Sequence, residues 1–162
     1  KSLKCLFTNR IRDLSKHRHY SREDQPLVNL SAELSRDSDM FHFTKVSEER
    51  LNTCHADLQT ICRTVIQDYN FLVVCGYRDE KAQNEAFNKG ASKVKFPNSK
   101  HNQLPSLAID LAPLPIDWNN LEQFHELAGH ILEVAHLLEI SIIWGGHWKT
   151  FKDYPHYELK KE

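Results

Sequence analysis

The chain has 162 residues, 40% hydrophobic and 27% charged, which predicts a single globular domain with a real core. The formal net charge of −1 provides no basic field, so we expect no nucleic-acid partner. There is no apolar run of about 18 residues and no apolar stretch near the start, which predicts neither a membrane span nor a signal peptide. We therefore expect synthesis in the cytoplasm. The four cysteines form no C-x-x-C motif, and we expect them to be reduced.

The first 40 residues show no clear periodicity, and we predict an N-terminal extension of unknown role over 1–40 and a compact domain over 41–162. A basic cluster spans Lys16–Arg22. It would suit an anionic surface, or nucleic acid through salt-sensitive binding. A solvated arm is the simpler explanation.

The segment after residue 41 predicts a long helix followed by a buried strand. Ser47 is a suitable N-cap, and apolar residues then recur at spacings of three and four up to about Tyr69. The β-prone segment Phe71–Cys75 follows and ends at Gly76.

The middle of the chain predicts a helix, a loop and a strand. Asp79 can cap a helix that runs through Asn88. Residues 91–106 are rich in Ser, Asn, Pro and Lys and predict a loop. Leu107–Leu111 predicts a strand, which we expect Pro113 to break.

The last third predicts a long helix and a hairpin. Asp117 can cap a helix with one apolar face that reaches Leu138, and Ile140–Trp144 predicts a third strand. Gly145 and Gly146 turn the chain, so that His156–Leu159 can pair with this strand. The expected fold is α+β, a small and mainly antiparallel sheet with helices packed on one face.

Two stretches hold candidate metal ligands. His101 lies on the predicted loop and Asp110 on the strand that follows it, while Asp153 precedes His156 by three residues. Two imidazoles and one carboxylate can bind zinc and leave a position open for water, and a second carboxylate can accept a proton from that water. Our hypothesis is that His101, Asp110 and His156 bind zinc and that Asp153 is the base.

Each of these residues also has an ordinary explanation. Asp110 would fit a strand-end acid bonded to backbone amides, His101 a loop histidine, and Asp153 an exposed turn residue. Ten histidines make a chance cluster easy to supply. The aromatic residues near the second stretch would either line a cleft or pack the hairpin; they are Trp144, Trp148, Tyr154 and Tyr157.

Three motifs in register narrow these alternatives. They are G-Y-R-D-E-K-A-Q at Gly76–Gln83, S-K-H…A-I-D at Ser99–Asp110, and W-G-G-H-W…D-Y-P-H at Trp144–His156. Together they resemble the zinc D-alanyl-D-alanine carboxypeptidase/dipeptidase family, and most of all phage endolysins that act as L-alanyl-D-glutamate peptidases. The resemblance covers about Phe41 to Leu159.

The resemblance implies a role for each matching residue. Asp153 corresponds to the catalytic carboxylate, and Arg78 to an arginine that binds substrate or stabilises the oxyanion. Ser99 and Gln83 fall where substrate is contacted. It also implies the hedgehog-like α+β fold. The implied zinc ligands are His101, Asp110 and His156.

The implied function is hydrolysis of an amide bond in the peptide stem of bacterial peptidoglycan by a zinc metallopeptidase. We expect a monomer. L-alanyl-D-glutamate cleavage is expected, with D-alanyl-D-alanine cleavage left open, and an endolysin would reach the wall through holin-made lesions. Two extra residues between His101 and Asp110, and Ser106 in place of a usual glycine, depart from the family pattern. The alternative is an inactive zinc-stabilised binding module, which a closed site including His147 would favour.

Overall fold

The computed structural model describes residues 41–160. The basic cluster Lys16–Arg22 lies outside the described residues, and the predicted role of 1–40 stays open. Within the described part, no helix is long and apolar enough to cross a membrane.

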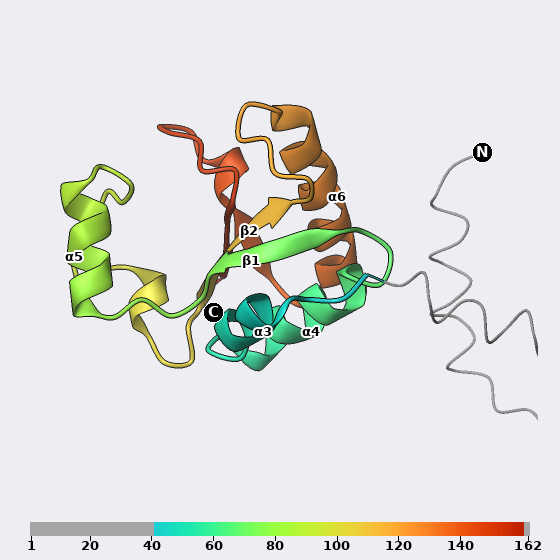
Figure 1. The fold of residues 1–162 in the computed structure, drawn as a ribbon, viewed down its shortest axis with the longest axis horizontal. Helices are drawn as coiled ribbons and strands as arrows, with labels where there is room; N and C mark the ends of the chain where they lie inside the picture. Colours follow the sequence, from blue (N-terminus) through green and yellow to red (C-terminus); the bar gives the residue numbers. More distant parts are fainter. Residues whose placement is uncertain (1–40, 161–162) are drawn as a thin grey trace, which may run out of the picture. The chain divides into compact units, whose positions relative to one another are not determined.

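A four-stranded antiparallel sheet forms the centre of the fold, with strand order β1-β2-β4-β3 (Figure 1). The predicted α+β class is confirmed. The elements in chain order are α3 Lys45–Leu51, α4 Ala56–Val65, β1 Phe71–Cys75, α5 Glu80–Asn88, the 3-10 turn η2 Lys100–Asn102, β2 Ala108–Pro113, α6 Leu121–Leu137, β3 Ile142–Trp144, the 3-10 turn η3 Gly145–His147 and β4 His156–Leu159.

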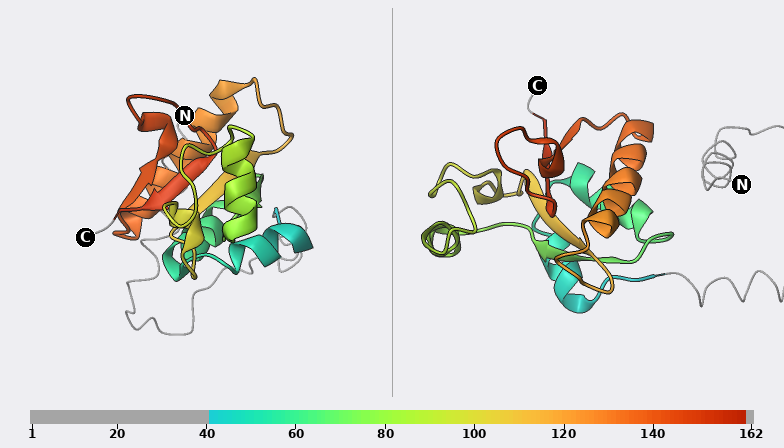
Figure 2. Two further views of the ribbon diagram at one scale, coloured as in Figure 1. Left: turned by 90° about the vertical axis from the view of Figure 1, so that its left-hand side faces the viewer. Right: turned by 90° about the horizontal axis from the view of Figure 1, so that it is seen from above.

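Helix α6 packs against β2 and β3, and α4 packs against α6. Figures 1 and 2 show both helices on one side of the sheet, while α5 and the loop after it extend on the other side. Side chains alternate along β2, so Ile109 and Leu111 point into the core under α6 and are buried. Asp110, between them, points to the opposite face. The sheet thus separates the apolar core from a polar site.

The helix predicted from Ser47 to Tyr69 is in fact two helices, α3 and α4. Thr44, rather than Ser47, caps α3 through its side chain, and Ser47 is buried, where its hydroxyl accepts a hydrogen bond from the Val73 amide at 3.2 Å. The apolar spacing continues across the break because both helices cover the same core.

The break between α3 and α4 comes from a contact distant in sequence. Cys54 forms an isolated β-bridge with Ser106. The Ser106 amide donates a hydrogen bond to the Thr53 carbonyl, and the Ser106 carbonyl accepts one from the His55 amide. This bridge holds the end of the loop before β2 against the helices, and such pairing leaves no signal in local periodicity.

The boundaries of two other elements also differ from the prediction. Asn120, rather than Asp117, caps α6, because Asp117 accepts from the Asn119 amide in the preceding turn. Strand β2 continues to Pro113, which lies opposite Phe71 in β1.

Candidate metal centre and active site

Three neighbouring strands place polar side chains in one row. In the sheet register, Asp110 of β2 lies opposite His156 of β4 on one side and opposite Cys75 of β1 on the other. Opposed residues of paired strands carry their side chains on the same face. Asp110 and His156, 46 positions apart in sequence, are therefore brought into contact by strand pairing.

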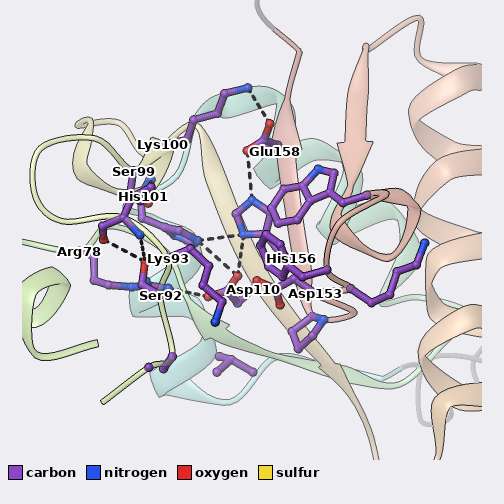
Figure 3. A pocket seen from close by; sticks show the side chains of 18 of the residues that line it. Arg78, Ser92, Lys93, Ser99, Lys100, His101, Asp110, Asp153, His156 and Glu158 are labelled. Carbon is purple, nitrogen blue, oxygen red and sulfur yellow. Dashed lines mark hydrogen bonds and ion pairs between the residues drawn. The ribbon is translucent and has the colours of Figure 1, made fainter. Parts of the chain in front are cut away.

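His101 reaches the same row from η2, and three donor atoms converge (Figure 3). Asp110 Oδ1 lies 3.3 Å from His101 Nε2 and 3.1 Å from His156 Nδ1, and the two ring nitrogens are 3.3 Å apart. Zinc–nitrogen distances of about 2.0–2.1 Å in a tetrahedron place neighbouring ligands about 3.3–3.4 Å apart. The triangle formed by His101, Asp110 and His156 thus fits three corners of a tetrahedral zinc site.

His101 is held from several sides and is 2% exposed. Its Nδ1 lies 2.7 Å from the Gly76 carbonyl, which leaves Nε2 directed at Asp110. The backbone of its turn is fixed by Ser99, which caps η2 and accepts from the His101 amide, and by the Arg78 amide, which donates to the His101 carbonyl. Ser99 therefore supports the candidate ligand directly.

The second oxygen of Asp110 is taken by Arg78. Arg78 Nη2 lies 2.7 Å from Asp110 Oδ2. The other guanidinium nitrogens donate to Cys75 Sγ and to Gln83 Oε1, both at 3.3 Å. Gln83 is fully buried, and its amide donates to Ser92 and to the Val94 carbonyl. Its side chain has no surface free for a substrate and instead anchors Arg78 and the loop after α5.

Asp153 lines the same cavity, and its side chain makes no hydrogen bond within the part of the chain described. Figure 3 shows it beside Asp110 and His156. Burial raises the pKa of Asp153, and the negative charge of Asp110 adds to the effect. Its backbone is fixed by the Gly145 carbonyl, which accepts from the Asp153 amide. A partly buried carboxylate with a raised pKa beside three candidate ligands is suited to accept a proton.

Charge pairing sets the pKa values of the candidate ligands. Burial opposes charge on His101, but the hydrogen bonds to Asp110 and Cys75 outweigh it and raise its pKa to about 9. The pKa of His156 is raised by Asp110 and Glu158 against burial. Both imidazoles in turn hold the pKa of Asp110 well below its usual range, against the effect of burial. A metal ion would therefore displace protons when it binds.

Cys75 is a nearby donor that the sequence interpretation missed. One donor atom each from Cys75, His101 and Asp110 lies within 4.8 Å of the others. Burial opposes a thiolate, but hydrogen bonds from His101 and Arg78 more than offset it and lower the pKa of Cys75. The only sequence signal for this donor was the place of Cys75 at the end of β1, directly before Gly76.

The cavity in front of this cluster has a volume of about 990 Å³. Of the four aromatic residues considered from sequence, only Trp148 lines it, because Trp144 and Tyr157 are buried in the core. Trp118 and Phe151, which the sequence interpretation did not select, supply the remaining aromatic surface. Both belong to loops, whose approach to the site depends on the tertiary fold.

Besides Lys100, three lysines on two separate loops line the cavity. Lys93 comes from the loop after α5, and Lys149 and Lys152 come from the segment after η3. Figure 3 shows Lys93 pointing into the cavity. The ion pairs found for residues 41–160 include none with these three side chains, whereas Arg78 and Lys100 are paired.

His147 does not belong to the cluster. It is exposed, contacts the Trp144 ring edge-on with centroids 4.9 Å apart, and is absent from the cavity wall. The closed four-ligand site that would have favoured a purely structural zinc is therefore not formed with His147.

Comparisons with known proteins identify a family for this chain. A family model described as phage L-alanyl-D-glutamate peptidase matches residues 39–161. The L-alanyl-D-glutamate peptidase of Escherichia phage T5 is 36% identical over 128 residues, covering 75% of this chain and 90% of the relative. The peptidoglycan L-alanyl-D-glutamate endopeptidase CwlK of Bacillus subtilis is 26% identical over 155 residues, covering 86% of this chain and 85% of the relative.

Among solved structures, the L-Ala D-Glu endopeptidase ChiX of Serratia marcescens matches with a TM-score of 0.65 and 31% identity, covering 76% of this chain and 93% of that chain. The family match spans all the described residues, including every member of the cluster around Asp110. The chain therefore belongs to the phage L-alanyl-D-glutamate peptidase family.

Proposed function

We propose that this chain is a zinc-dependent endopeptidase that hydrolyses the L-alanyl-D-glutamate bond in the peptide stem of bacterial peptidoglycan. The observation that carries the proposal is the triangle of donor atoms from His101, Asp110 and His156, with Asp153 on the wall of the same cavity. Family membership supports cleavage of this bond, because the names of the relatives above specify the L-alanyl-D-glutamate bond.

His101, Asp110 and His156 would hold the metal in this proposal. When bound, zinc supplies Lewis-acid chemistry, acidifying a water molecule and polarising a carbonyl group. Asp153 accepts the proton of the attacking water and returns it to the leaving amine. Its raised pKa suits both halves of this transfer, because the group must be able to hold the proton in between.

Arg78 has a different main role in this proposal from the one inferred by resemblance. Its three side-chain nitrogens already donate to Asp110, Cys75 and Gln83. It acts first as a positioning residue for Asp110, and any contribution to oxyanion stabilisation comes from hydrogens that remain free. Gln83 likewise positions Arg78, while Ser99, on the cavity wall, remains a proposed substrate contact.

The lysines on the cavity wall suit an acidic substrate. A D-glutamate residue linked to L-alanine keeps a free carboxylate close to the scissile bond. Lys93, Lys149 and Lys152 surround a cavity that also contains Asp153, so they offset its repulsion of an anionic peptide.

We propose that the enzyme works as a monomer and meets the wall from the cytoplasmic side after holin-type membrane lesions form.

Synthetic stem peptides test the proposal directly. Purified protein with one equivalent of zinc is incubated with an L-alanyl-D-glutamyl peptide, its glutamate-amidated analogue and a D-alanyl-D-alanine-terminated peptide, and products are identified by mass spectrometry. The expected result is cleavage after L-alanine, faster for the acidic peptide than for the amide. Release of D-alanine instead would assign the carboxypeptidase activity, and no cleavage of any peptide would favour the binding module.

A further inference from the structure

Glu158 contacts the candidate metal ligand His156 at the ring nitrogen that does not contact Asp110. It lies two residues after His156 on β4, so both side chains point to the same face of the sheet. Glu158 Oε2 lies 3.2 Å from His156 Nε2, the ring nitrogen that faces away from Asp110. The other carboxylate oxygen, Oε1, lies 3.1 Å from Lys100 Nζ. The Glu158 and Lys100 side chains are only 17% and 20% exposed.

The contact determines which nitrogen His156 presents. A carboxylate accepts hydrogen bonds, so the proton of the neutral imidazole is drawn to Nε2 and the lone pair of Nδ1 is left facing Asp110 and His101. His101 is oriented in the reverse sense by the Gly76 carbonyl, which leaves its Nε2 free. The two imidazoles therefore offer opposite ring nitrogens to the same point.

Lys100 extends this arrangement across the site. It directly precedes His101 in η2, while Glu158 follows His156 in β4. Lys100 also donates to the Leu159 carbonyl. The Lys100–Glu158 ion pair therefore ties the loop that carries one candidate ligand to the strand that carries another, 55 positions further along the chain.

We propose that Glu158 and Lys100 are positioning residues for the metal centre. Glu158 fixes the tautomer and ring orientation of His156, and Lys100 holds Glu158 in place. The inference rests on the proposed zinc site and goes beyond it, because neither residue is among the proposed ligands. Carboxylate partners of metal-binding histidines typically change metal affinity by about 10- to 100-fold.

The test measures zinc affinity by competition with a chromophoric chelator in the full chain. We expect Glu158→Ala to weaken zinc binding about 10- to 100-fold, and Lys100→Met to weaken it less. Lys100→Arg keeps a cation and should restore most of the affinity. In the Glu158→Ala background, Lys100→Met should add much less than in the wild type, because Lys100 acts mainly through Glu158. Absorption spectra of the cobalt-substituted variants should shift in the same order.

Glu85→Ala is the matched control, because Glu85 pairs with Lys89 on the exposed surface of α5, outside the cavity wall. It should leave zinc affinity and the cobalt spectrum unchanged. Wild-type zinc affinity in Glu158→Ala, with a lowered free energy of unfolding alone, would overturn the inference and make the pair merely structural. Absence of zinc binding by the wild type would overturn the proposed function as well, so the two failures are distinguishable.

Discussion

Arg78 and Asp110 are joined by a short ion pair, with Nη2 and Oδ2 2.7 Å apart and both side chains about 15% exposed. The pair divides the carboxylate, since Oδ1 faces the two imidazoles and Oδ2 faces the guanidinium. Asp110 therefore has one oxygen for a metal ion, and Arg78 compensates the charge of the other. A motif arginine that resemblance assigns to the substrate is thus built into the candidate metal centre.

Arg78→Ala is expected to weaken metal binding as well as catalysis. Removing the guanidinium leaves Asp110 Oδ2 without its partner, and loss of such an outer partner costs about 10- to 100-fold in metal affinity. Zinc titration and kcat measured at saturating zinc separate the two effects. Arg63→Ala is the control, because Arg63 pairs with Glu48 and neither residue lines the cavity. Unchanged zinc affinity with a reduced kcat would return Arg78 to the oxyanion role.

Asp153→Asn is expected to stabilise the metal-free protein near neutral pH. The pKa of Asp153 is raised in the folded state, so the folded protein binds its proton more tightly than the unfolded chain does. The ionised side chain therefore costs stability above the usual Asp pKa of about 3.9, and the cost disappears as pH falls below it. Thermal unfolding at pH 7 should show a higher Tm for the variant, and this gain should shrink as pH falls through the folded-state pKa toward the usual Asp pKa. An equal or lower Tm at pH 7 would argue against a raised pKa.

His156 and His147 offer a matched pair of histidines from the same part of the chain. His156→Ala should abolish stoichiometric zinc binding and activity, because it removes one corner of the donor triangle. His147→Ala should retain both, since His147 is exposed and lies outside the cavity wall. Metal analysis after gel filtration checks the prediction, and the reverse pattern would move the third ligand to His147.

Gly76→Ala is expected to disturb the site through the backbone. A Cβ at Gly76 would lie 2.4 Å from the Arg50 carbonyl oxygen and from Thr53 Oγ1, so the strand end must shift. The Gly76 carbonyl accepts from His101, and its displacement should weaken zinc binding together with a loss of about 1–3 kcal/mol in the free energy of unfolding.

Gly129→Ala is the control for Gly76→Ala, because Gly129 lies on the exposed surface of α6 with nothing within 4 Å of an added Cβ. It should stabilise the protein by up to about 1 kcal/mol through helix propensity. Denaturant unfolding followed by zinc titration measures both variants. Equal behaviour of the two would show that the close contacts at Gly76 relax without consequence.

Much of the sheet could be predicted from the sequence, because strand alternation is local. The run Leu107–Leu111 already predicted a strand that carries Asp110, and β3 and β4 pair as expected. The structure also brings together His101, Asp110 and His156, which the motifs had selected from ten histidines and many acids.

The remaining features depend on contacts between distant segments. The break between α3 and α4 follows from the bridge of Cys54 to Ser106, which no helical periodicity reveals. Lys100 and Glu158 pair only because the loop before β2 lies against β4. Gln83 is the clearest case, since a polar residue in a motif suggests substrate contact and its full burial becomes evident only in three dimensions.

The central claim is that Asp153 and a zinc ion held by His101, Asp110 and His156 together cleave the peptidoglycan stem. The most direct measurement is the release of new amino termini from purified peptidoglycan by wild-type protein and by Asp153→Asn, each with zinc and with a chelator. We predict that only the wild-type protein with zinc releases new termini, and that these termini belong to D-glutamate. The inactive variant should still bind zinc stoichiometrically. Equal release by the variant, or release that persists with the chelator, would contradict the account.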